Sequence, residues 1–111
     1  MSMASEELAD RIRAYLSPAL PIREQRMFGG IAFMHSGNML VAVMKDGGLL
    51  ARVGKDDMDA ALDLPGASPM NMGGRNMTGF VAVSGDAIED DEALNDWIAR
   101  CSRFVATLPP K

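Results

Sequence analysis

The sequence predicts an α+β fold in which N- and C-terminal helices pack on one face of an antiparallel sheet. The sheet should have five to six strands, arranged as a meander followed by a hairpin. Three observations carry this prediction. Apolar residues recur at helical spacing near both ends of the chain. The segment between them consists of short apolar runs separated by glycine-rich turns. Long helical crossovers, which a doubly wound parallel sheet requires, are missing from that segment.

The N-terminal helix should begin near Ser5, because serine is a favourable N-cap and two glutamates follow in the first turn. Its apolar stripe consists of Leu8, Ile12, Tyr15 and Leu16. We expect Pro18 and Pro21 to end it, since proline disfavours the helical state in the preceding residue.

The meander follows as an extended segment over 23–35, interrupted by two glycines, and strands over 39–45 and 49–53. The strongly apolar strand 39–45 predicts that both of its faces are covered. Asp46-Gly47-Gly48 is typical of a hairpin turn. In the third strand, alternation places Leu49, Ala51 and Val53 on one face, and Leu50 and Arg52 on the other.

The second half should contain a short helix after Asp57, a hairpin formed by 68–72 and 76–83, and a long final helix. The short helix should point Met58, Ala61 and Leu62 inward. In the second hairpin strand we expect Thr78, Phe80 and Ala82 on one side. The final helix should be capped by Asp90 or Asp91, with an apolar stripe of Leu94, Trp97, Ile98, Cys101, Val105 and Leu108.

Bulk composition indicates one domain covering residues 1–111, with 48% hydrophobic residues and enough length for a single core. The single cysteine permits no internal disulfide, and the longest apolar run, 39–44, is too short to span a bilayer. We therefore expect a cytoplasmic protein without a membrane segment. The ten methionines and few aromatic residues indicate that methionine fills part of the core, although it also suits adaptable binding surfaces.

The charge balance, 11 basic against 15 acidic residues with a net charge of −4, argues against direct DNA binding and favours a protein partner. A meander also leaves an edge strand, and homodimerisation is one way to cover it.

Two glycine pairs are the most distinctive local features. The first lies in Met27-Phe28-Gly29-Gly30, where it indicates a bulge, a sharp bend or a close approach to the backbone. The motif's role is expected to be structural. The second lies in Gly73-Gly74-Arg75, which is either a plain hairpin turn or a small anion-binding nest beside the guanidinium.

Catalytic chemistry has little support in the sequence. His35 is the only histidine, and Cys101 lies in an apolar helix stripe where a buried thiol is inert. An enzyme would require His35 to meet Cys101 or a carboxylate at a pocket. We therefore expect no enzymatic activity, no catalytic residues, no cofactor and no metal.

With these residues in view, the chain resembles the N-terminal domain of the TfoX/Sxy family of bacterial competence regulators. The resemblance starts at Met27-Phe28-Gly29-Gly30 and continues through the meander, the short helix, the second hairpin and the helix with Trp97. It implies an α+β domain with an antiparallel sheet. Full-length relatives carry a second, helical C-terminal domain and are described as coactivators of DNA-uptake genes that work with the cyclic-AMP receptor protein. The resemblance covers only their first domain, and we therefore expect a single-domain member of the family.

Two functions from different classes remain open at this point. The first is a non-enzymatic regulatory domain that contacts a protein partner in transcriptional or competence regulation. The alternative is a small-ligand sensor, with the ligand near Gly29-Gly30 or Gly73-Gly74 and walled by methionines.

Overall fold

The computed structural model describes residues 3–16, 22–27, 29–72 and 74–109. The elements follow the order α1 (Met3–Tyr15), β1 (Ile22–Met27), β2 (Gly30–His35), β3 (Asn38–Val43), β4 (Leu49–Arg52), α2 (Met58–Leu62), β5 (Ala67–Met72), β6 (Arg75–Val83), the short 3-10 helix η1 (Gly85–Ile88) and α3 (Asp91–Val105). The 3-10 helix was not predicted. The expected ends of the first helix at Pro18 and Pro21 lie outside the described residues.

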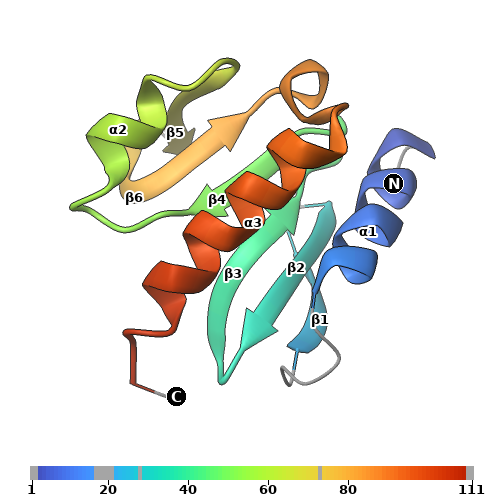
Figure 1. Cartoon of the computed structure of the whole chain (residues 1–111), viewed down its shortest axis with the longest axis horizontal. Helices are drawn as coiled ribbons and strands as arrows, with labels where there is room; N and C mark the ends of the chain where they lie inside the picture. Colours follow the sequence, from blue (N-terminus) through green and yellow to red (C-terminus); the bar gives the residue numbers. More distant parts are fainter. Residues whose placement is uncertain (1–2, 17–21, 28, 73, 110–111) are drawn as a thin grey trace.

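The strands form one antiparallel sheet in the order β1-β2-β3-β4-β6-β5 (Figure 1). β1 to β4 make the predicted meander, and β5 and β6 make the predicted hairpin. The hairpin joins the meander through β6, so β1 and β5 are the two edges. The α+β class and the antiparallel sheet are confirmed, with six strands.

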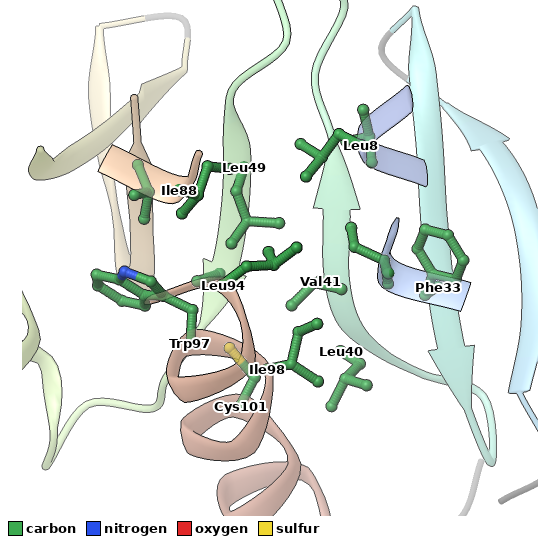
Figure 2. Close-up of a cluster of buried hydrophobic side chains, with 14 of the residues drawn as sticks. Leu8, Phe33, Leu40, Val41, Leu49, Ile88, Leu94, Trp97, Ile98 and Cys101 are labelled. Atoms are coloured by element: carbon green, nitrogen blue, oxygen red, sulfur yellow. The ribbon is translucent and has the colours of Figure 1, made fainter. Parts of the chain in front are cut away.

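The helices all cover the same face of this sheet. α3 crosses the middle of the sheet and α1 lies beside it, while α2 packs against the β5–β6 hairpin (Figure 1). Asp90 caps α3 by accepting a hydrogen bond from the backbone N–H of Glu92 at 3.2 Å. The core between α3, α1 and the strands contains the predicted helix stripe, including Leu94, Trp97, Ile98 and Cys101 (Figure 2).

The first glycine pair lies at a chain reversal. Met27 and Gly30 are cross-strand partners, so β1 folds back on β2 as a hairpin. Of the three roles predicted for the pair, the bulge is therefore wrong and the sharp bend is correct. The N-terminal helix also begins earlier than expected, since Ser5 lies inside α1 and does not cap it.

Two irregularities break the simple alternation of the strands. A register shift between Phe33 and Met34 leaves Leu40 as an extra residue of β3, so Leu40 and Val41 both join the helix-side core. On β6, Gly79 has φ +88°, and its carbonyl accepts hydrogen bonds from the N–H groups of Val53 and Gly54. As a result Met77 packs with Phe80 and Ala82, whereas alternation predicted Thr78 in that place.

Trp97 tests the packing of α3 on the sheet, because its side chain is only 4% exposed. We expect Trp97→Ala to lower the free energy of unfolding by about 3–5 kcal/mol, since it removes buried surface and leaves a cavity. Urea unfolding measures this change. Asn95→Ala, at an exposed position of the same helix, should change it by less than about 0.5 kcal/mol. A loss of less than about 1 kcal/mol for Trp97→Ala would contradict the packing described.

Candidate functional site

The face of the sheet opposite the helices carries a second apolar cluster, here called the methionine face. It comprises Ala32, Met34, Met39, Ala42, Met44, Leu50, Met70, Met77, Phe80 and Ala82. No described helix packs against it, since the buried residues of α1, α2, η1 and α3 all belong to the other cluster. This face is the largest apolar feature of the described chain that lacks a second layer of secondary structure.

Fully buried residues lie at the centre of this face, and half-buried ones pack against them. Ala32 is 0% exposed and Leu50 only 2% exposed although no helix covers them. Met34, Met39, Met77 and Phe80 are half-buried and pack against this centre. The flexible methionine side chains thus shield the centre while they themselves contact solvent.

Two expectations are corrected here. Strand 39–45 was predicted to be covered on both faces, but only its helix side has a second layer, and Ala42 on the other side is buried by neighbouring side chains. The core-filling role predicted for methionine fits Met70, which is buried. It is wrong for Met34, Met39, Met44 and Met77, which are only half-buried. The sequence pattern does not show this, because a strand buried by neighbouring side chains has the same apolar pattern as a strand covered by helices.

The charges on this side of the sheet are cationic. Arg23 lies opposite Met34 in the β1–β2 pair, Arg52 lies opposite Phe80, and Arg75 precedes Met77 by two residues on β6. Glu24 is the only one of the fifteen acidic residues that lies within a strand, and it is opposite Phe33 on the helix-covered side. The strands thus carry a net positive charge, and the excess of acidic residues lies outside them.

Arg52 marks the border between the methionine face and α3. Its guanidinium carbon lies 5.6 Å from the ring centre of Phe80 and 5.7 Å from that of Phe104. Cation–π contacts at these distances hold the cation beside two aromatic rings. Arg52 thus places a positive charge at the edge of the methionine face.

The first glycine pair has a steric basis at Gly30. A Cβ added there would lie 1.7 Å from the carbonyl oxygen of Val43, so only glycine allows β2 to approach β3 this closely. Gly29 has φ +76° and is exposed, and a Cβ added there would make only ordinary contacts with the Lys45 side chain. Phe28 and the Met27 side chain lie outside what the structure describes.

The second glycine pair is open to solvent where it is described. Gly74 has φ +83° and nothing within 4 Å of an added Cβ, and its N–H donates to Asn71 Oδ1 at 3.2 Å. Arg75 is exposed, and Gly73 lies outside the described residues. The hairpin turn is present, and an anion nest at Gly74 and Arg75 stays a prediction.

The structure keeps the lone thiol and the lone imidazole apart. Cys101 is fully buried in the core, and desolvation raises the pKa of its thiol to about 12. His35 lines a pocket with Ile22, Leu40 and the C-terminal end of α3, and Cys101 is not among the residues lining it. Among the described residues lining this pocket, His35 therefore meets neither Cys101 nor a carboxylate, the two partners considered for it from the sequence.

The family model of the TfoX N-terminal domain matches residues 14–105, which is most of the 111-residue chain. The chain belongs to the TfoX N-terminal domain family. The match runs from the end of α1 to the end of α3 and includes all six strands, so the methionine face lies on the TfoX N-terminal domain itself. No curated protein and no solved structure matches the chain significantly.

Within the described part of this TfoX N-terminal domain, none of the helices combines the length and apolar character that crossing a bilayer requires.

Gly30 and Gly74 form a matched pair for testing the glycine motif. Gly30→Ala should lower the free energy of unfolding by about 3 kcal/mol or more, because its Cβ would overlap the Val43 carbonyl. Gly74→Ala should cost about 1–2 kcal/mol, because its strain comes from positive φ alone. Thermal and urea unfolding of both variants measure the difference, and equal losses would contradict a packing role for Gly30.

Cys101 provides a chemical test of the closed core. At about pH 8 its thiol should resist Ellman's reagent in the native protein, because it is buried and its pKa is raised to about 12. In denaturant the same thiol should react completely. Rapid modification of the native chain would show that Cys101 is accessible and reopen a role for it as a nucleophile.

Proposed function

We propose that this chain is a non-enzymatic interaction domain in transcriptional or competence regulation, and that it binds a protein partner through the methionine face. The observation that supports this most strongly is an apolar sheet face that no described helix covers. Half-buried methionines adapt to different apolar surfaces at low cost, which makes such a face suited to docking.

The partner's chemistry follows from the charges around the face. Arg23, Arg52 and Arg75 lie on this side, and none of the strands contributes an acidic residue to it. An amphipathic segment with apolar residues toward the methionines and carboxylates toward the arginines complements both features. The proposed partner is therefore an acidic, amphipathic segment of another protein.

A second copy of this chain fits the face less well. Two methionine faces in contact would bring the arginines of both copies together without strand carboxylates to neutralise them, and such like-charge contacts disfavour pairing. Bare DNA would satisfy the arginines but leave the methionines without apolar contacts, and the chain's net charge of −4 opposes it.

The interaction test compares two opposite charges at one position. Met77→Glu and Met77→Lys both remove an apolar contact, but only the glutamate also repels an acidic partner. In NMR titrations with a synthetic Leu- and Glu-rich amphipathic helix, Met77→Glu should weaken binding at least tenfold and Met77→Lys by clearly less. Ala99→Glu, at an exposed position of α3, is the control and should leave binding unchanged.

Two results of this titration and two results of other experiments would contradict the proposal. One is equal binding by a peptide with Lys in place of Glu. Another is chemical-shift changes confined to α1 and α3. Specific DNA binding in a mobility-shift assay would replace the protein partner with nucleic acid, and concentration-dependent dimerisation through Met77 would replace it with a second copy.

The regulatory role is tested in cells of the source organism that lack the gene. Transcripts altered by the deletion should be restored by the wild-type chain and by Ala99→Glu, and not by Met77→Glu at equal protein level. If deletion changes no transcripts, or if Met77→Glu restores them fully, regulation through this face is ruled out.

A further inference from the structure

A pocket of about 320 Å³ lies on the opposite side of the sheet from the methionine face, where β2 and β3 meet the C-terminal end of α3. Described residues that line it are Ile22, His35, Leu40, Ser102, Arg103, Val105 and Ala106. Its size is at the lower end of the range for small-molecule sites. Most of these side chains are aliphatic, so the pocket suits a hydrocarbon group.

Three features of the chain create this pocket. Ile22 and His35 are cross-strand partners and therefore point to the same side. The extra residue at the β2–β3 register shift turns Leu40 toward the helix side. Buried Asn38 donates from Nδ2 to the carbonyl of Pro109 at 3.0 Å, which ties the segment after α3 to the start of β3. The walls are thus held by the sheet, the helix and the segment that follows it.

His35 presents an unsatisfied polar atom at this place. Its Nδ1 is buried and has no hydrogen-bond partner among the described residues. A buried polar atom without a partner costs free energy, and native structures leave few of them. Since His35 also lines the pocket, the imidazole that carries this atom lies beside any ligand bound there.

Arg103 supplies the charge of the site. It is exposed, lines the same pocket, and forms no ion pair with any described residue. None of the lining residues named above is acidic. An anionic group at the opening would therefore meet a cation and no carboxylate from the described residues that line the pocket.

We propose that this pocket binds a small aliphatic carboxylic acid. The hydrocarbon part packs against Ile22, Leu40 and Val105, and the carboxylate bonds to the guanidinium of Arg103 and to the imidazole of His35. The pocket lies apart from the glycine pairs, near which a ligand was expected from the sequence. The proposal also does not depend on the partner proposed for the methionine face, because the two sites share no side chain.

The single histidine makes the test direct, because its ring signals in an NMR spectrum need no assignment by mutation. Hexanoate is the probe, and hexan-1-ol and hexylamine are matched probes with the same chain and a different head group. Hexanoate should shift the His35 ring signals and the amide signals of Val105 and Ala106 saturably. It should leave the indole signal of the single tryptophan, Trp97, in place. Hexan-1-ol should bind at least tenfold more weakly, and hexylamine should not bind.

Two variants separate the polar contacts from the packing. His35→Phe keeps a ring of similar size and removes Nδ1, and Arg103→Gln removes the charge, so each should weaken hexanoate binding at least tenfold. Arg26→Gln removes an exposed charge on β1 and should leave binding unchanged. Thermal unfolding confirms that each variant is folded, and His35→Gln replaces His35→Phe if the latter does not fold.

The proposal is overturned if hexanoate produces no saturable shift of the His35 ring up to millimolar concentration. It is also overturned if hexan-1-ol binds as well as hexanoate, or if both folded variants bind hexanoate like the wild type. Either of these last results would mean that the pocket takes up hydrocarbon without recognising the carboxylate.

Discussion

The packing of α3 across the middle of the sheet determines where everything else in this domain can lie. Leu94, Trp97, Ile98 and Cys101 point from one side of the helix into the central strands (Figure 2). With the centre occupied, α1 and α2 pack at the flanks of the same face and complete one core. The apolar stripes of all described helices pack on that face, so no described helix covers the opposite face of the sheet.

The uncovered face persists because its own side chains protect it. Alanines at its centre leave room for methionines to lie across them, and the unbranched thioether chains adapt to the irregular surface of a twisted sheet. The arginines at its border keep the surface soluble without introducing acidic groups. A face of this kind is stable in water and still offers apolar contacts to a partner, which links its composition to the proposed function.

Sequence periodicity predicted the elements well because each pattern is local. The stripe of α3, the alternation around Leu50 and the turn at Asp46 depend on neighbouring residues only. The structure confirms them, except that α3 ends at Val105 and so does not include Leu108. Periodicity did not predict whether the face that holds Leu50 has a second layer, because this depends on where distant helices pack. The extra residue at Leu40 and the switch at Gly79 were missed for a related reason, since they arise from pairing between strands.

The pocket beside His35 also shows that local sequence patterns do not reveal contacts between distant parts of the chain. In the sequence His35 is a polar residue beside a turn, and nothing near it in the chain suggests a ligand. Only the fold brings Val105 and Arg103, about seventy residues further along the chain, to the same place. Along β2, Met34 belongs to the methionine face and the next residue, His35, lines the pocket, so one strand contributes to both candidate sites from opposite sides. Substitutions at Met77 therefore leave the pocket lining intact, and substitutions at His35 leave the methionine face intact, which allows the two sites to be distinguished by experiment.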